Sequence, residues 1–522
     1  MSWLKQNKKN LIFIAFLFIL LLPSVFSILI PGYFESDDGE WMVIRFSAFY
    51  QALSDGQFPV RFLGRLNFGY GYPVANFLYP GFMYLATPLQ VLGFGFVNSV
   101  KVIMLASFLG GGFFTYLWLS KIFDRTSALV GATVYTYAPY HLFDLYKRGS
   151  VGEVLSMGVL PFILWQIERN SIFWTATGIF LLILSHNTLA VLFLLFISGY
   201  ISFNVYISKT RKQLISRYIL VVLLGLGMAS FFWIPAFYDL KYTVFSNTQI
   251  SDWTNYFADI DLIGLPTLAV FALIVILIIS KKIKIKKHRL TILFLAVGLF
   301  SVFLSTSAST LLWNFIPSSF VQFPFRFLSL LVPSVAFLAA CAVSVINGKN
   351  KIILAIALFI LVFVSSFSFL NPEVKSNKTE SFYSTNEATT TVRDEYMPEW
   401  VKEKPNYRFG KKVEILIGGE VSNLSYNSER IYFETSGDTD KMARINTIYY
   451  PGWQAEVNNN KVQISYDNPQ GVMEINLPKG ENKVELVFKE TPVRLFANIL
   501  SLVSFILLIV ICRKSVINIF KK

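Results

Sequence analysis

The sequence predicts a polytopic α-helical membrane protein with about twelve transmembrane helices and an external β-sandwich-like domain before the last helix. Three observations predict this fold class. Hydrophobic residues make up 54% of the 522 residues and charged residues only 15%, which is too little charge for the surface of a soluble fold. Long apolar runs are separated by basic clusters. One late segment instead alternates apolar and polar residues.

The first apolar run, residues 11–30, is long enough to cross a hydrocarbon core of about 30 Å. It follows Lys5, Lys8 and Lys9, and no small-residue cleavage site comes after it, which favours a retained helix over a signal peptide. The other spans follow from keeping the basic clusters in the cytoplasm. They are expected at 96–120, 126–141, 152–168, 171–186, 188–207, 217–237, 262–280, 290–307, 325–346, 351–369 and 493–512.

This alternation predicts a multi-pass protein of the plasma membrane, with both termini cytoplasmic and residues 371–492 external. Counting residues 77–94 as another span would place the basic cluster at 281–289 outside, so this stretch is predicted to be an interfacial helix. A second interfacial helix is predicted at 40–54. The net charge of +14 is explained by short cytoplasmic loops, so no nucleic-acid partner is predicted.

The late segment contains short alternating strings, such as "RIYFETSG" and "NKVELVFKE", separated by Asn, Gly, Asp and Pro. This is the pattern of antiparallel strands. The two cysteines, Cys341 and Cys512, lie in apolar runs and are expected to be packing residues rather than a disulfide or a metal pair. The predicted domains are a membrane domain at 1–370 with a first external loop at 31–95, a linker at 371–404, a β-rich domain at 405–492, and the last helix with a basic cytoplasmic tail at 493–522.

Titratable residues gather on the predicted external face. The string "FESDDGEW" at 34–41 follows the first span and holds four carboxylates. Carboxylates this close raise each other's proton affinity or bind a cation, although a solvated loop is the simpler alternative. Asp37, Asp38 and Glu40 are therefore candidate ligands of a divalent cation such as Mg²⁺ or Mn²⁺.

Three further external segments carry candidate binding residues. The string "YAPYHLFDLYKRGSVGE" at 137–153 contains two external cations, which suit a lipid phosphate. A turn at 186–187 and the start of a helix at 321–327 add an imidazole, amides and a guanidinium, although a helix cap and a snorkelling arginine are the alternatives. Together they predict one membrane-proximal site. Its candidate residues are His141, Asp144, Arg148, Glu153, His186, Asn187, Gln322 and Arg326.

These strings, together with "NFGYGYPVANFLYPGFMYL" and "LSHNTLA", resemble the membrane family named as 6-pyruvoyl-tetrahydropterin-synthase-related. That family is similar to the GT-C superfamily of integral membrane glycosyltransferases. The resemblance covers about residues 10–330, and "YYPGWQAEV" resembles the β-rich tails of such proteins. It implies a GT-C-like fold in which the first external loop carries a catalytic carboxylate and two interfacial helices.

The resemblance implies that the donor is a polyprenyl-phosphate-linked sugar, drawn from the membrane lipid, and that the acceptor is a glycan or a protein on the external face. Asp37 or Asp38 would be the catalytic base, and the two stay equally open. Arg148 and Arg326 would hold phosphate, while His141, Glu153 and His186 would orient sugar or bind a metal. The family often has a histidine shortly after the first-loop aspartate, whereas here Glu40 and Trp41 occupy that place.

Two other functions compete with glycosyl transfer. A flippase or transporter of a lipid-linked glycan would need ionisable residues near the bilayer midplane, and the predicted spans hold almost none. A non-catalytic cell-envelope protein could bind glycans through the β-rich domain, where Trp453 would stack on a sugar unless it is a core residue.

Overall fold

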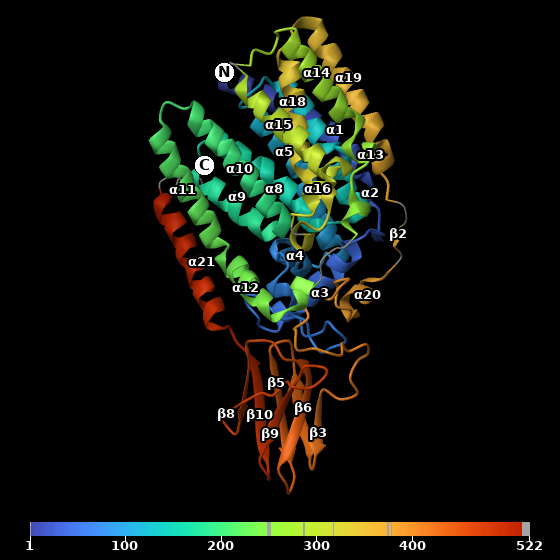
Figure 1. Cartoon of the computed structure of the whole chain (residues 1–522), viewed down its shortest axis with the longest axis vertical. Helices are drawn as coiled ribbons and strands as arrows, with labels where there is room; N and C mark the ends of the chain where they lie inside the picture. The colour runs from blue at the N-terminus through green and yellow to red at the C-terminus, as the bar shows by residue number, and fades with distance from the viewer. Residues whose placement is uncertain are drawn as a thin grey trace.

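The structure of the chain is a computed structural model. It describes residues 2–247, 252–285, 288–316, 318–372, 375–376 and 378–513. The predicted basic tail beyond residue 513 lies outside the described residues. The helices form one body, and strands from the last quarter of the chain project from one end of it (Figure 1).

Helices form at every stretch predicted to span the membrane. The helical body contains α1 (Ser2–Leu21), α2 (Phe26–Leu29), α5 (Phe96–Leu119), α6 (Arg125–Thr136), α7 (Pro139–Leu142), α8 (Val151–Glu168), α9 (Ile172–Ser185), α10 (Asn187–Ile207), α11 (Arg211–Met228), α12 (Ser230–Asp239), α13 (Ile260–Ile263), α14 (Leu265–Ile279), α15 (Arg289–Ser305), α16 (Thr310–Trp313), α17 (Ser318–Val321), α18 (Leu328–Ser344), α19 (Gly348–Ser366) and α21 (Pro492–Ile511).

By length and apolar composition, seven helices of the described residues could cross a membrane, or up to nine if each of two bent pairs counts as one span. Twelve spans are therefore not confirmed. The shortfall has a physical reason: α6, α9 and α14 have only 12, 14 and 15 residues. At 1.5 Å per residue these helices are about 18–22 Å long, shorter than the hydrocarbon core.

One predicted span is not straight. The sequence predicts a single helix over 217–237, but α11 ends at Met228 and the helical segment that begins at Ser230 runs 66° away from it. The bend matters for the site because α12 then meets the first loop, where Asn76 bonds to Asp239. Green α11 and α12 flank one side of the body in Figure 1, and red α21 runs along them.

The first loop, residues 31–95, forms α3 (Gly39–Ser54) and α4 (Gly81–Val91) at the two stretches predicted to be interfacial. Both lie between the helical body and the strands (Figure 1). Just before α3, β1 (Tyr33–Phe34) pairs antiparallel with β2 (Lys375–Ser376). The short helix α20 (Glu380–Thr385) follows β2 and packs on α3. The stretch predicted as a linker is thus partly folded onto the first loop.

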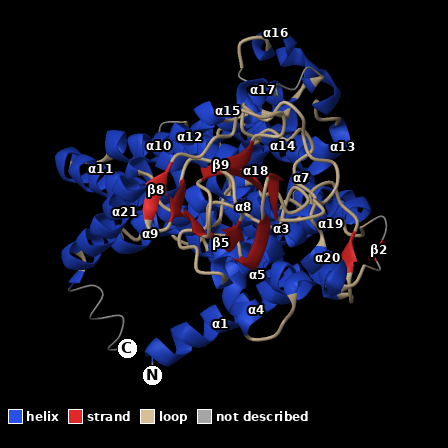
Figure 2. Cartoon of the chain, turned by 90° about the horizontal axis from the view of Figure 1, so that it is seen from below, coloured by secondary structure: helices blue, strands red, loops and turns tan. Residues whose placement is uncertain are grey.

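The late strands form two antiparallel sheets. One has the order β4-β5-β10-β7-β8 and the other β3-β6-β9. Buried residues alternate along β5 and β10, and the inward residues of both sheets belong to one hydrophobic cluster, as in a sandwich. Seen from below, the strands lie over the middle of the helical body (Figure 2). The strands are β3 (Val413–Ile417), β4 (Glu420–Tyr426), β5 (Arg430–Ser436), β6 (Lys441–Ile448), β7 (Trp453–Val457), β8 (Asn460–Val462), β9 (Val472–Leu477) and β10 (Asn482–Phe488).

A buried ion pair joins the strands to the helical body where α21 begins. Arg494 donates to the same oxygen of Asp239, at the end of α12, from Nε at 3.0 Å and Nη2 at 2.8 Å. Asn76 and the hydroxyl of Tyr450 also donate to that oxygen. Both charged side chains are almost fully buried. The pair therefore fixes α12, the first loop and the β-rich region to one another.

Candidate functional site

The acidic loop is held against the segment at 143–148 by its backbone. The N–H groups of Asp37 and Asp38 donate to the carbonyls of Lys147 and Arg148, at 3.0 and 2.8 Å. Gly149 permits this approach because its φ is +60° and a Cβ there would overlap the side chain of Ser36. The glycine in "KRGS" therefore has a defined role: it lets two segments that are distant in the sequence meet at Asp38.

Three charged groups continue inward from Asp38. Arg148 bridges Asp38 at 2.8 Å and Glu153 at 2.9 Å. Glu153, in the first turn of α8, also accepts from Nε of Arg326 at 3.0 Å. Its other oxygen accepts from the hydroxyl of Tyr140 at 3.0 Å. Glu153 is fully buried, whereas the side chain of Asp38 is 35% exposed, so the group runs from a solvated carboxylate to a buried one.

His186 joins this group and also caps a helix. Its Nδ1 accepts from the N–H of Leu189 in the first turn of α10, which assigns the proton of the neutral ring to Nε2. Nε2 lies 3.7 Å from an oxygen of Glu153, and the ring lies against Tyr79 with centroids 4.7 Å apart. His186 can therefore both cap α10 and belong to the charged group.

The two amide candidates sit at the edge of the charged group. Gln322 accepts from Nη1 of Arg326 at 2.5 Å and has a φ of +64°. Asn187 donates to the backbone carbonyl of Phe77 at 2.9 Å, which ties the start of α10 to the first loop. Gln322, Asn187 and His186 also line the pocket described below.

Asp144 and His141 are placed differently. Asp144 is buried beside Glu153. Burial, followed by the negative charge of Glu153, raises the pKa of Asp144 well above its ordinary value. His141 packs against Phe108, with ring centroids 4.2 Å apart, and its Nδ1 lies 3.2 Å from the carbonyl of Tyr135. Its described contacts are aromatic and backbone groups rather than the ion pairs.

The three carboxylates proposed to bind a divalent cation do not converge. Glu40 accepts from Lys378 at 2.7 Å, Ser376 at 2.8 Å and Tyr383 at 3.0 Å, while Asp38 is bound to Arg148. Across the described part of the chain, no three His, Cys, Asp or Glu side chains gather as a metal site would require. The predicted ligand set does not fit a bound Mg²⁺ or Mn²⁺, and we derive no chemical step through a metal.

Glu40 instead holds α20 on α3. Burial acts to raise the pKa of Glu40, but hydrogen bonds from Lys378, Ser376 and Tyr383 outweigh it and lower the pKa. Because the depressed pKa favours the ionised form, this stabilisation is present above the ordinary glutamate range and is lost as the pH falls through the lower, folded value.

We expect Glu40→Gln to speed amide hydrogen exchange in residues 380–385 at neutral pH, with no matching change in α8. Unchanged exchange there would contradict this role.

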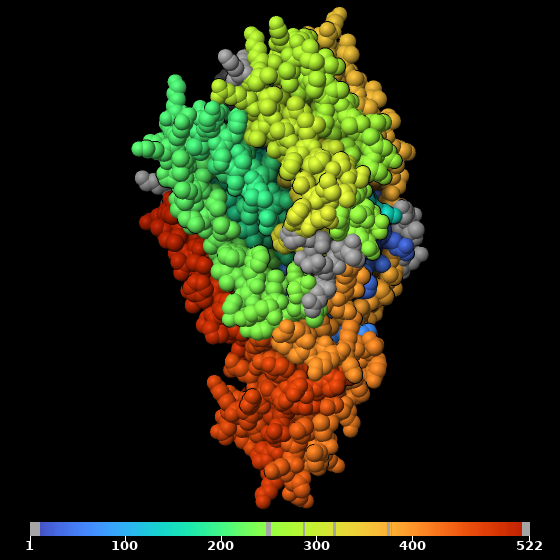
Figure 3. Space-filling model, in the orientation of Figure 1, coloured from blue at the N-terminus to red at the C-terminus, as the bar shows by residue number. Residues whose placement is uncertain are grey.

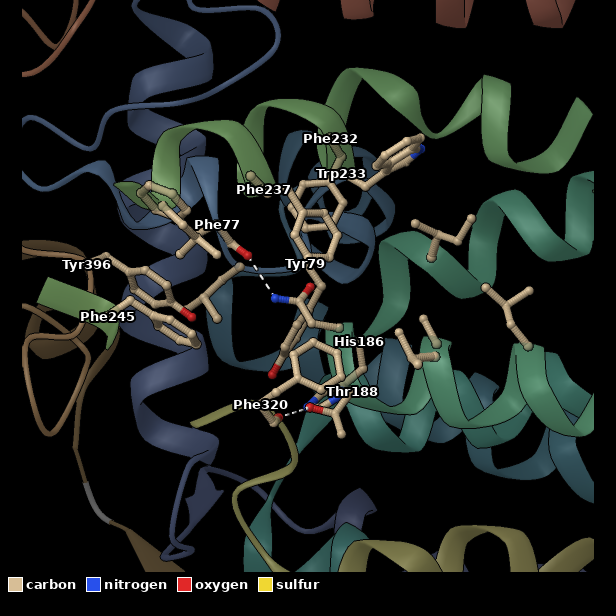
Figure 4. A pocket seen from close by; sticks show the side chains of 18 of the residues that line it. Phe77, Tyr79, His186, Thr188, Phe232, Trp233, Phe237, Phe245, Phe320 and Tyr396 are labelled. Carbon is tan, nitrogen blue, oxygen red and sulfur yellow. Dashed lines mark hydrogen bonds between the residues drawn. The ribbon is translucent and has the colours of Figure 1, made fainter. Parts of the chain in front are cut away.

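An apolar cavity of about 280 Å³ opens beside the charged group. Aromatic side chains from α12, from the first loop and from the segment before α18 surround it, and His186 stands at one end (Figure 4). Its walls come mainly from α10 and α12, and residues 77–79 of the first loop complete them. The molecular surface is recessed between these green helices and the yellow residues near 300 (Figure 3). The cavity thus links the polar site to the apolar faces of membrane helices.

Sequence reasoning missed several residues of this site. Tyr140, which binds Glu153, lies in a predicted span, and Tyr79, in the predicted interfacial stretch at 77–94, packs against His186. Tyr396 lines the cavity although it belongs to the predicted linker. With 25 tyrosines in the chain, single tyrosines gave no usable signal. Gly152, a glycine inside a predicted helix, was a weak sign that another residue packs closely there. In the structure a Cβ at Gly152 would overlap the ring of Tyr79.

The model of one protein family matches residues 78–371, more than half of the chain, and is described as a 6-pyruvoyl-tetrahydropterin synthase related domain of a membrane protein. The chain belongs to this family. The matched residues of this family member include the ion pairs around Glu153 and the helices that line the cavity. No curated protein matches its sequence.

Among solved structures, the chain is similar to the oligosaccharyltransferase of Archaeoglobus fulgidus in a complex with Zn and sulfate, with 15% identity and a TM-score of 0.41, over 69% of this chain and 54% of that one. A structure of the same archaeal enzyme with an inhibitory peptide and a dolichol-phosphate shows 13% identity and a TM-score of 0.42. The similarity covers 75% of this chain and 57% of that one. The similarity to the arabinofuranosyltransferase AftD from Mycobacteria has 14% sequence identity and a TM-score of 0.40. It covers 69% of this chain and 27% of AftD. The chain therefore spans about half the length of the first enzyme and about a quarter of the second.

Proposed function

We propose that this protein is a membrane glycosyltransferase of GT-C type, which moves a sugar from a polyprenyl-phosphate donor to a glycan or protein acceptor on the external face. The observation that carries the proposal is the position of the ion pairs around Glu153. They adjoin, through His186 and Gln322, an apolar cavity lined mainly by residues of α10, α12 and the first loop. A lipid with a phosphate head and an apolar chain has the matching chemistry.

The charges support a phosphate at this position. The guanidinium groups of Arg148 and Arg326 meet at the buried carboxylate of Glu153, and Asp38 pairs with the outer side of Arg148. Guanidinium groups bind phosphate oxygens through paired hydrogen bonds. Glu153 is best described as a positioning residue, because its carboxylate bonds to both arginines and to Tyr140. His186 and Gln322 then border both the arginines and the cavity.

Asp38 is the better of the two candidate bases. Its carboxylate is partly exposed and bound to Arg148, at the outer end of the charged group. In the proposed reaction it takes the proton of an acceptor hydroxyl, whose oxygen bonds to the anomeric carbon. The bond from that carbon to the phosphate oxygen breaks, and its electrons leave with the polyprenyl phosphate. The arginines stabilise the charge that develops on this leaving group, and the sugar configuration inverts.

The proposal is tested by incubating membranes that contain the protein with undecaprenyl-phosphate glucose and undecaprenyl-phosphate mannose, together with a cell-envelope glycan extract. We expect labelled sugar to enter the glycan and undecaprenyl phosphate to be released in equal amount. Movement of intact donor across protein-containing liposomes without release of undecaprenyl phosphate would instead favour a flippase.

The lipid-binding part of the proposal predicts a specific effect of filling the cavity. Val191, on α10, lines it and is 39% exposed, whereas Leu195, one turn further along, does not line it and is 67% exposed. Overpacking costs about 1–3 kcal/mol, so Val191→Trp should raise the KM for the donor by roughly 5- to 100-fold. Leu195→Trp is the matched control and should leave KM unchanged. Equal KM values in the two variants would place the lipid elsewhere.

A further inference from the structure

A second cavity, of about 340 Å³, lies on the other side of the first loop. It is formed where the end of α3 and residues 64–69 meet the chain after α20 and the β-rich region. Gln51, at its rim, and Asp38 stand at opposite ends of α3. At 1.5 Å per residue, the two positions are about 20 Å apart. This cavity is therefore separate from the proposed transfer site.

The lining of this second cavity is rich in positive charge. Arg65, Arg408 and Lys412 line it, and Glu387 is the acidic residue among its lining residues. Arg408 pairs with Glu387, which leaves two cations without a carboxylate. Lys412 is buried and its Nζ donates to the backbone carbonyls of Gly69 and Asn446, each at 2.9 Å. Burial, then the charge of Arg408, lowers the pKa of Lys412 to about 7, so a bound anion would stabilise its charged form.

The same cavity offers groups that suit sugar rings. Tyr426, on the edge strand β4, is 47% exposed and lines it, together with the amides of Gln51 and Asn427. Two deeply buried lining residues, Thr447 and Trp453, have a hydroxyl and an indole N–H without a hydrogen-bond partner. A buried polar group without a partner costs about 1–3 kcal/mol. A hydroxyl-bearing ligand that reaches these groups would therefore gain favourable hydrogen bonds.

We propose that this cavity binds an anionic carbohydrate chain, whose carboxylate or phosphate groups meet Arg65 and Arg408 and whose rings rest on Tyr426. The inference does not depend on glycosyl transfer, because it rests on the lining of the cavity alone. Stacking of Trp453 on a sugar ring is not part of this proposal. Trp453 is only 4% exposed, and its ring packs against Phe62 and Phe488. The exposed aromatic surface belongs to Tyr426 instead.

The test uses the full-length protein in nanodiscs, with no donor present, and measures binding by isothermal calorimetry. The probes are oligogalacturonate, its methyl-esterified uncharged form, a short phosphomannan, and polyglutamate as an anionic chain without sugar rings. We expect at least one anionic glycan probe to bind and the esterified form to bind at least about tenfold more weakly, since a charge-assisted hydrogen bond contributes about 1.5–3 kcal/mol. Which anionic glycan probe binds distinguishes a carboxylate ligand from a phosphate ligand.

Two pairs of variants localise the binding. Arg408→Gln and Tyr426→Ala should each weaken it by about tenfold or more. Arg430→Gln and Tyr407→Ala should not, because Arg430 and Tyr407 are exposed residues of the same region that do not line the cavity. Equal binding of the esterified probe, equal loss in the control variants, or tighter binding of polyglutamate than of either anionic glycan probe would each overturn the proposal. Absence of binding by every probe would also overturn it.

Discussion

Asp38→Asn is expected to lower the rate of sugar transfer by about 10²–10⁴-fold, which is the usual contribution of a general base. Asn has nearly the same shape and can still accept a hydrogen bond from Arg148, so the local fold should persist. The loss should fall on kcat rather than on the KM for the donor, because the phosphate is proposed to meet Arg148 and Arg326. Single-turnover transfer from labelled undecaprenyl-phosphate sugar measures both.

The matched control is Glu35→Gln, which removes an exposed carboxylate from the same loop and should keep wild-type rates. Asp37→Asn decides between the two candidates that the sequence left open. If Asp37→Asn abolishes transfer while Asp38→Asn retains it, the base is misassigned. If both variants transfer at the wild-type rate, the loop is not catalytic.

Asp239→Leu is expected to destabilise the folded protein by about 3–5 kcal/mol, because it leaves the buried charge of Arg494 without its partner. The oxygen that is lost accepts hydrogen bonds from Arg494, Asn76 and Tyr450. The effect should appear as a lower midpoint of thermal unfolding in detergent. It should also appear as faster proteolysis between the strands and α21.

A double-mutant cycle separates the charge from the packing. Asp239→Leu combined with Arg494→Leu should recover much of the lost stability, since apolar replacement of a whole buried ion pair is often neutral or stabilising. The exposed pair Lys351–Asp124 provides the comparison: Lys351→Met should cost no more than about 1 kcal/mol. Additive losses in the double variant would show that the two side chains are not energetically coupled.

The sequence located the helices well but not the number of membrane spans. Apolar runs and basic clusters predict helices at positions where the structure has them, because both signals are local. Three of these helices are too short to count as spans, and the 66° bend after Met228 depends on packing with α21. Strand β4 was also missed, because most of its residues are exposed and the alternating pattern of a half-buried strand is absent.

For the site, the sequence predicted that four separate segments form one group but not how their residues pair. Asp38, Arg148 and Glu153 do come together, as do His186 and Arg326; their roles stay predictions. The separate placement of Glu40 could not be foreseen, since its partners lie in the stretch predicted to be a linker. His141 faces aromatic rings because α7 turns it inward, and one-dimensional spacing carries no information about that orientation.

The pairing of the acidic loop with the chain beyond residue 371 has a consequence for biosynthesis. Glu40 and Ser376, whose side chains are hydrogen-bonded, are 336 positions apart. At 5–20 residues per second, the ribosome needs roughly 20 to 70 s to make the intervening polypeptide. Until then the loop lacks β2 and α20, even though α1 has long since emerged. The nascent protein should therefore remain inactive through most of its translation, and a product terminated before β2 should be recognised by quality-control proteases.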